Sequence, residues 1–335
     1  MHRLVALLVA VLTVAAAVLL APVASRTQAQ FQMETPLTAT RRFLPAVGPG
    51  FRTIARGPGG RYYVLTAPGG VAQIYDADGE RVGQVPVDAA LGARGARIVY
   101  GEWLDVDATG RVVVCDRAAN AVKIYSPEGM LSTVIPVNAP LSAVLLPGGE
   151  VAVASPETPQ LVTVYDLAGK QVRQYGEPEE ISERVDVNRQ ANRGRLAGDA
   201  AGNSYFSFEF LPEPTVRKFD RAGYLVSEIS LMTLEFEPAA QSARRAIARS
   251  AQGTPALHRI ITAVGVDPAT EDVWLAIGTL LMHFDKEGQR KASFRTYTPA
   301  GARLAASSIL VEPDRLLLGA DPQGIYEFPR PQPVN

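Results

Sequence analysis

The sequence predicts an all-β protein made of repeated four-stranded antiparallel sheets, and three observations support this. An aromatic residue followed by a tight turn that ends in glycine occurs five times, a second turn precedes each copy, and the spacing between the two turns is nearly constant. Apolar residues alternate or form short β-rich runs around these turns, as they do in β-strands.

The aromatic turns have the composition of β-hairpin turns. An Asp at the start can accept hydrogen bonds from the backbone amides of the turn, and glycine takes the positive φ that the turn requires. The five copies are Tyr75–Gly79, Tyr125–Gly129, Tyr165–Gly169, Phe219–Gly223 and Phe284–Gly288.

The second turns are rich in Gly, Pro and Asp, and each ends 18 to 21 residues before the glycine of the following aromatic turn. They are Gly57–Gly60, Asp107–Gly110, Pro147–Gly149, Asp199–Gly202 and Asp267–Thr270. Two strands fit between the turns, and one strand lies on either side, which makes four strands per unit. Such a unit cannot bury both faces alone, and a repeat of this length predicts stacked blades of a β-propeller.

A sixth unit begins at Ile309 and ends near Phe328 with only three strands. The missing outer strand is most simply supplied by residues near Arg41 to Leu44, which would close the ring. We therefore predict that residues 30–335 form a single six-bladed β-propeller whose N-terminal strand completes the last blade.

One unit carries a family motif. Residues Val112 to Gly129 resemble an NHL repeat, with Val-x-Asp ending at Asp116 in the second strand, Asn120 before the third strand, and the aromatic turn after it. The other units match only in the turn and strand pattern. The resemblance implies a six-bladed propeller of the NHL-repeat type.

The N-terminal residues predict a secretory signal. Arg3 precedes an 18-residue run from Leu4 to Ala21 that only Thr13 interrupts, and small residues precede a cleavage site after Ala29. The alternative is an uncleaved membrane anchor, because the run is close to the lower limit for a span. We expect residues 1–29 to be a signal peptide and the protein to be exported, either periplasmic or secreted.

Charge and cysteine content restrict the partners. Without residues 1–29 the chain carries 31 basic and 34 acidic side chains, so we expect no nucleic-acid partner, and membrane contact only through an uncleaved N-terminal segment. The single Cys115 cannot form an internal disulfide, and its apolar neighbours predict that it is buried. We expect a monomer.

The direction of the chain predicts which face binds. Both short turns of a unit lie at one end of the strands, so the loops between second and third strands and the connections between units share the opposite face, which we call the insertion face. The long insertions fall there, at residues 88–99, 155–160, 178–195, 209–214 and 235–258. Variable loops on a rigid scaffold are where binding sites are usually built. Pro238, the alanines after it and Gly253 predict a short helix near residues 238–251.

Polar residues of the insertion face are the candidate ligand contacts. For the arginines of the predicted helix we favour a solvated basic face that pairs with nearby glutamates, and binding of an anion is the alternative. Each of the other candidates is more often a solvated or paired side chain than a ligand contact. The candidates are Glu102, Asp105, Arg117, Asn120, Asn192, Arg193, Arg195, Arg244, Arg245 and His258.

No catalytic constellation is visible. Only His258 and His283 would remain after export, too few for a three-histidine zinc site, and a calcium site made by Glu102, Asp105 and Asn192 has no spacing signature. We therefore predict no cofactor, with calcium as the one alternative. The favoured function is an exported module that binds a protein, peptide or glycan at the cell envelope. The alternative is a lactonase-like propeller hydrolase or lyase with a divalent metal on the axis.

Overall fold

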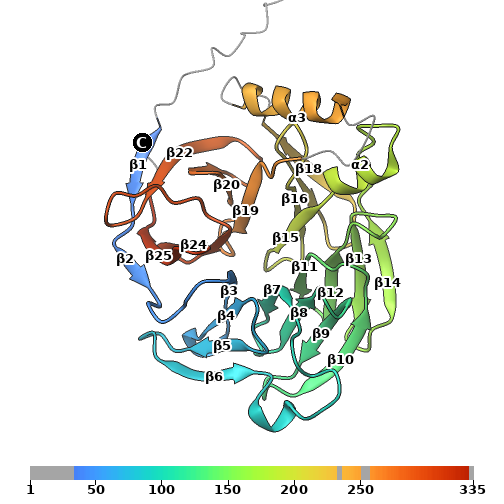
Figure 1. Cartoon of the computed structure of the whole chain (residues 1–335), viewed down its shortest axis with the longest axis vertical. Helices are drawn as coiled ribbons and strands as arrows, with labels where there is room; N and C mark the ends of the chain where they lie inside the picture. The colour runs from blue at the N-terminus through green and yellow to red at the C-terminus, as the bar shows by residue number, and fades with distance from the viewer. Residues whose placement is uncertain (1–33, 232–235, 250–256, 332–335) are drawn as a thin grey trace, which may run out of the picture. The chain divides into compact units, whose positions relative to one another are not determined.

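The protein folds as the predicted six-bladed β-propeller. The computed structural model describes residues 34–231, 236–249 and 257–331, so the predicted signal peptide and the helix end expected at Gly253 lie outside the described residues. The described residues form six sheets, one for each repeat. Figure 1 shows these sheets arranged in a ring, with the first strand of each blade toward the centre.

Blades 1 to 3 each contain four consecutive antiparallel strands. Blade 1 comprises β3 (Phe51–Arg56), β4 (Tyr62–Thr66), β5 (Ala72–Tyr75) and β6 (Arg81–Val85). Blade 2 comprises β7 (Gly101–Val106), β8 (Val112–Asp116), β9 (Ala121–Tyr125) and β10 (Leu131–Pro136). Blade 3 comprises β11 (Ser142–Leu146), β12 (Glu150–Ala154), β13 (Val162–Asp166) and β14 (Gln171–Tyr175).

Blades 4 and 5 repeat this pattern, and blade 6 has three strands from the C-terminal part of the chain. Blade 4 comprises β15 (Gly194–Gly198), β16 (Ser204–Phe208), β17 (Thr215–Phe219) and β18 (Leu225–Ser230). Blade 5 comprises β19 (Ile261–Val266), β20 (Val273–Ile277), β21 (Leu280–Phe284) and β22 (Arg290–Tyr297). Blade 6 comprises β23 (Ser308–Val311), β24 (Arg315–Ala320) and β25 (Gly324–Pro329).

The N-terminal segment closes the ring. Strand β2 (Arg41–Phe43) pairs antiparallel with β25 and so supplies the fourth strand of blade 6, as predicted. A further strand, β1 (Thr35–Thr38), was not expected; it pairs in parallel with β22 and gives blade 5 a fifth strand. Because β22 is eight residues long, its outer edge would otherwise present a row of unpaired backbone groups.

The aromatic turns are held by the side chain at their start. Oδ1 of Asp76 accepts hydrogen bonds from the amides of Asp78 and Glu80, at 3.0 and 2.9 Å. The same pair of bonds occurs in the turns that begin at Asp166, Asp220 and Asp285. The glycine that ends each of the five turns has φ between 78° and 96°, a conformation that other residues adopt at a cost.

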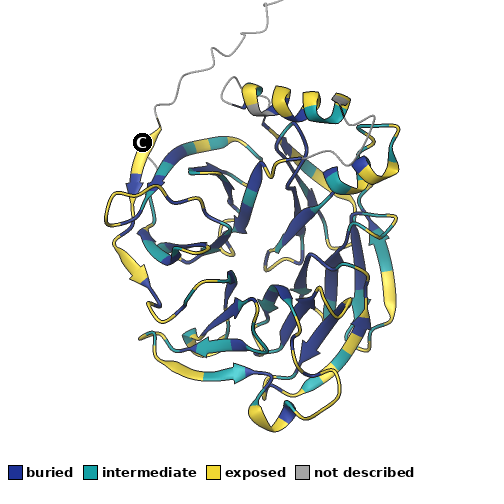
Figure 2. Ribbon diagram, viewed as in Figure 1, coloured by how far each residue is buried: buried dark blue, intermediate teal, exposed yellow. Residues whose placement is uncertain are grey.

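The apolar core lies between the blades. Inner and middle strands are buried, whereas the outer strands β6, β10, β14 and β18 are largely exposed (Figure 2). Cys115 on β8 is unpaired and fully buried, as predicted, and this burial raises the pKa of its thiol. The rigid ring thus leaves its loops and its central axis as places for a site.

Two α-helices occur in the connections between blades. Helix α3 (Glu237–Arg249) confirms the predicted helix, and its Ala246 and Ile247 pack on the apolar cluster that contains Phe210. Helix α2 (Val185–Ala191) was missed, because no side chain at Arg184 caps its start. Two 3₁₀ turns, Pro58–Gly60 and Asp88–Ala90, complete the helical elements of the described residues. None of the helices described is long and apolar enough to cross a membrane.

Candidate functional site

A small cavity lies on the axis of the ring at the insertion face. It has a volume of about 230 Å³ and is lined by charged side chains that come from different blades. We call it the channel basin and define it by Arg52, Glu102, Trp103, Arg195 and Arg259, which line the cavity, with Arg193 and Glu209 beside them. Because every inner strand starts at the insertion face, the fold gathers residues that are far apart in the sequence.

The repeat itself aligns these side chains. Arg52, Glu102 and Arg195 are each the second residue of an inner strand, in β3, β7 and β15. Arg259 lies two residues before the next inner strand, β19. The loop that follows β16 contributes Glu209, whose backbone donates to the carbonyl of Arg193 and accepts from the amide of Ile260.

Arg195 pairs with both buried glutamates of the basin. Its Nη2 lies 2.7 Å from Oε1 of Glu102, its Nε lies 3.1 Å from Oε1 of Glu209, and its Nη1 donates to the carbonyl of Leu141. The guanidinium also lies over the ring of Trp103, 5.4 Å from the centroid. Burial alone would lower the pKa of Arg195, but the two carboxylates outweigh it and raise that pKa. This arginine is therefore fixed as a cation.

The basin holds more positive than negative charge. Glu209 Oε1 also binds Nε of Arg259 at 3.1 Å, so the two buried carboxylates are shared between Arg195 and Arg259. Arg52 and Arg193 form no ion pair with any described residue. Cζ of Arg52 instead lies 5.3 Å from the ring centroid of Tyr100, and Cζ of Arg193 lies 5.3 Å from that of Phe210.

Two further groups modify this balance. Asp321 at the edge of the cavity is exposed and accepts a hydrogen bond from the amide of Gly50. Arg117, exposed just after β8, adds positive charge near Arg193. Five guanidinium groups thus face three carboxylates, two of which are already engaged by Arg195 and Arg259.

The excess of positive charge contributes to lowered pKa values of Arg193 and Arg259. Burial and the charges of Arg117, Arg195 and Arg259 lower the pKa of Arg193, against the opposing effect of Glu209. Burial, Arg195 and Arg52 likewise lower the pKa of Arg259, again against Glu209. Among the described residues, Nε of Arg52, Nε of Arg193 and Oε2 of Glu209 are buried without a hydrogen-bond partner. Buried polar groups are normally paired, so the hydrogen bonding of this site is incomplete within the described residues.

A second and larger hollow opens at the other end of the axis. It has a volume of about 660 Å³ and lies among the short turns. We call it the turn-side funnel and define it by the half-buried Trp103, Asp105, Leu145, Ala197 and Leu310. Oδ2 of Asp105 accepts the amide of Leu145 at 2.8 Å. Burial raises the pKa of the Asp105 carboxyl to about 6, although the amides of Leu145 and Val106 oppose this shift.

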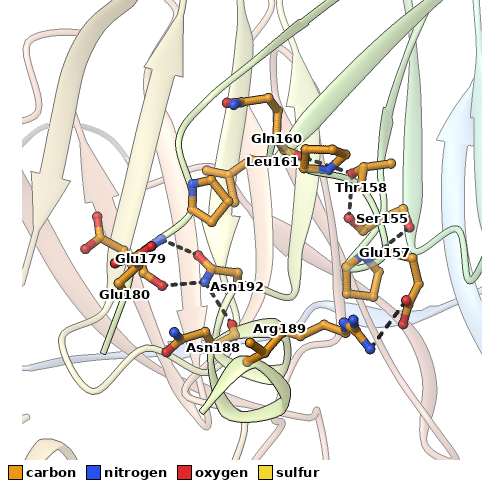
Figure 3. A pocket seen from close by; sticks show the side chains of 14 residues that line it. Ser155, Glu157, Thr158, Gln160, Leu161, Glu179, Glu180, Asn188, Arg189 and Asn192 are labelled. Atoms are coloured by element: carbon orange, nitrogen blue, oxygen red, sulfur yellow. Dashed lines mark hydrogen bonds and ion pairs between the residues drawn. The ribbon is translucent and has the colours of Figure 1, made fainter. Parts of the chain in front are cut away.

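A third hollow, of about 480 Å³, lies on the insertion face between the loop after β12 and helix α2 (Figure 3). The ion pair between Arg189 and Glu157, 3.5 Å long, connects its two sides. Asn192 holds one wall: its Nδ2 donates to the carbonyls of Glu179 and Asn188, and its Oδ1 accepts the amide of Glu179. The amide group of Asn192 is therefore occupied within the connection itself.

The predicted site residues fall into several places. Glu102, Arg193 and Arg195 meet in the channel basin, with Arg117 nearby. His258 is exposed and adjoins Arg259 in sequence. Asp105 lies instead in the turn-side funnel, so Glu102, Asp105 and Asn192 line three different hollows and not one.

The other candidates have structural partners. Asn120, at φ 48°, accepts the amide of Ala139 and so ties the loop after β8 to the connection that leads to blade 3. On α3, Arg244 pairs with Glu213 and Glu237, and Arg245 donates to the carbonyl of Gln241. Arg244 is thus paired with glutamates, as expected for a solvated basic face, whereas the contact of Arg245 is to a backbone carbonyl.

Sequence reasoning missed three members of the basin, namely Arg52, Glu209 and Arg259. A comparison of equivalent positions in the repeats would have found Arg52, which stands at the same position of its inner strand as Glu102 and Arg195. Glu209 and Arg259 lie outside the strands, and the repeat gives no signal for them.

Within the described ranges, no three His, Cys, Asp or Glu side chains gather as a metal site would need. Carboxylates of the basin are bound by arginines, and Asp272 is bound by His283 and Lys291, each at 2.7 Å. The chemistry that the basin supports is therefore recognition of an anion by guanidinium groups.

Comparison with known proteins shows the fold. The sequence matches no family model. Comparison with curated proteins finds no match either. Hydrazine synthase of Kuenenia stuttgartiensis has 13% sequence identity and a TM-score of 0.53, over 84% of this chain and 96% of that chain.

Two lyases are similar to the same extent. A streptogramin B lyase has 12% identity and a TM-score of 0.54, over 85% of this chain and 84% of that chain. The virginiamycin B lyase of Staphylococcus aureus has 13% identity and a TM-score of 0.52, over 85% of this chain and 88% of that chain. At this level of identity the likeness concerns architecture, and it establishes a six-bladed β-propeller of the kind found in virginiamycin B lyase.

Proposed function

We propose that this protein is an exported binding module that holds an anionic ligand in the channel basin of its insertion face. The observation that carries the proposal is the set of guanidinium groups without carboxylate partners, Arg52 and Arg193, beside the partly shared Arg259. Buried charges are normally paired, and a ligand carboxylate or phosphate would supply the missing negative charge.

The dimensions of the basin support a small anionic group. A volume of about 230 Å³ corresponds to about eight water molecules at ~30 Å³ each. This suits a carboxylate or phosphate with a few further atoms, either as a small molecule or as the anionic end of a peptide or glycan. The planar fork of arginine matches both groups in a bidentate manner.

Two parts of the proposal rest on the sequence. The apolar run near the N-terminus supports export, and the motif around Asp116 and Asn120 supports a repeat of the NHL type. Asp116 has a clear role in the blade that carries the motif, because it accepts the amides of Val99 and Tyr100 and pairs with Lys123 at 2.7 Å. A propeller lyase with a bound divalent metal is the alternative function, as two fold neighbours are lyases by name.

Isothermal titration calorimetry of the purified protein tests the proposal. Inorganic phosphate and succinate should bind, neutral succinamide should not, and affinity should fall with ionic strength. Arg259→Gln or Arg193→Gln should weaken binding about tenfold or more, since each removes a charge-assisted contact. Arg244→Gln on the same face, outside the basin, is the matched control and should bind as the wild type does.

Two results would overturn the proposal. Equal binding of succinate and succinamide would mean that charge is not recognised. Stoichiometric calcium or zinc in protein purified without chelator would favour the lyase alternative.

A further inference from the structure

The turn-side funnel combines an apolar wall with one unpartnered carboxylate. Leu145, Ala197 and Leu310 are half-buried in the wall, and the hollow is also lined by the buried Val144, Leu196 and Val264. Asp105 is hydrogen bonded to backbone amides, and no cation among the described residues pairs with it. A carboxylate in such surroundings is poorly compensated.

Every other charged side chain of the funnel is already satisfied. Arg56 pairs with Glu312 at 2.9 Å, and Arg111 pairs with Asp107 at 3.2 Å. Asp199 accepts from Nδ2 of Asn203 and from the hydroxyl of Tyr205, at 2.7 and 3.1 Å. Among the described charged groups of the funnel, Asp105 is therefore the one held by backbone amides alone, and it lies beside apolar surface.

We propose that the turn-side funnel binds a small amphiphilic cation, with its ammonium group against Asp105 and its hydrocarbon part against Leu145, Ala197 and Leu310. The charge complementarity selects a cation, and the apolar wall adds affinity in proportion to the area that it covers. This site is separate from the channel basin in ligand charge and in the face that it uses. Trp103 lines both hollows and offers an optical signal for either.

A series of three probes of equal chain length tests the proposal. n-Octylammonium, n-octanol and octanoate are titrated into the purified protein below their aggregation concentrations, by calorimetry and by tryptophan fluorescence. Trp274 is fully buried, so a spectral change reports chiefly on Trp103. We expect octylammonium to bind about tenfold more tightly than octanol, and octanoate to bind most weakly.

The variant Asp105→Asn keeps an oxygen that can accept the amide of Leu145, so it removes the charge and leaves the fold intact. It should abolish the preference for octylammonium over octanol, while phosphate binding in the channel basin stays unchanged. Asp78→Asn, in an exposed turn outside the funnel, is the control. In wild type, octylammonium binding should weaken as the pH falls below about 6, because Asp105 becomes protonated while the amine keeps its charge.

Each outcome decides the proposal. Equal affinity for octylammonium and octanol, absence of binding, or an unchanged preference in Asp105→Asn would overturn it. Loss of phosphate binding together with retained octylammonium binding would contradict the channel basin and leave the funnel standing.

Discussion

Oε1 of Glu209 lies 3.1 Å from Nε of Arg195 in the interior of the propeller, while its Oε2 has no partner among the described residues. The same Oε1 also lies 3.1 Å from Nε of Arg259. One carboxylate thus compensates two guanidinium groups. Its removal would leave both arginines with less compensation than the protein interior normally requires.

We expect Glu209→Gln to lower the free energy of unfolding by about 3 kcal/mol, because the buried Arg195 then keeps Glu102 but loses its second carboxylate. Inorganic phosphate should raise the melting temperature of this variant by more than it raises that of the wild type, as measured by thermal unfolding at constant ionic strength. Glu213→Gln, which breaks an exposed pair with Arg244, should cost less than about 1 kcal/mol. Equal effects of the two substitutions would contradict the role given to Glu209.

The ion pair of Asp116 and Lys123 is buried within blade 2. Burial alone would raise the pKa of Asp116, but hydrogen bonds from Lys123 and the amides of Tyr100 and Val99 outweigh it and lower that pKa. A lowered carboxyl pKa adds stability above about pH 4, and this stability is lost as the pH falls further. Asp116→Asn should therefore cost about 3 to 5 kcal/mol at neutral pH.

Denaturant unfolding at pH 7 and near pH 3 measures this difference. The cost of Asp116→Asn should be smaller at the acidic pH, because the carboxyl is then protonated in the unfolded state and the ionised folded form loses its advantage. The double variant with Lys123→Met should be more stable than the single variant, because no charge then remains buried alone. A cost that does not depend on pH would show that the ion pair is not its source.

The pKa of Asp105 is shifted in the opposite direction to that of Asp116. Its pKa is raised to about 6, so the folded state is stabilised when the carboxyl is protonated and loses that stability as the pH rises through 6. Asp105→Asn should raise the free energy of unfolding by up to about 3 kcal/mol at pH 8, and the gain should vanish below pH 4. Chemical denaturation at the two pH values measures it. A variant less stable than wild type at pH 8 would refute this account.

The two N-terminal strands should contribute unequally. A chain that begins at Thr40 loses only β1, an added fifth strand, so its melting transition should stay cooperative. A chain that begins at Pro45 also loses β2, and with it Phe43 and Leu44, each 2% exposed. We expect the shorter chain to aggregate or to unfold without cooperativity, as seen by circular dichroism and gel filtration. Identical melting curves for the two chains would contradict ring closure by β2.

The fold was predictable because its determinants are local. The turn at Asp76, and the three like it, specify their hairpins through one side chain and one glycine, so the blades can be read from the sequence in order. Strand β1 was not predictable in this way, because its partner β22 is defined only in three dimensions.

The candidate site was predictable only in part. Glu102, Arg193 and Arg195 were found because they flank or begin inner strands, whereas Glu209 and Arg259 depend on how two connections fold back to the axis. Asp105 was assigned to the insertion face, but it lies three residues along β7 from Glu102, nearer the turns. Along an inner strand, a few residues separate one face of the ring from the other.

The closing strand has a consequence for the order of events during synthesis. Arg41 meets Glu327, a partner 286 residues later in the chain, and Phe43 lies opposite Ile325. Strand β2, one of the first to leave the ribosome, must therefore wait for β25, the last of the described strands, and until then the ring stays open between blades 1 and 6. Contacts of such long separation slow folding, so the nascent protein needs protection of this open side for nearly the whole of its translation.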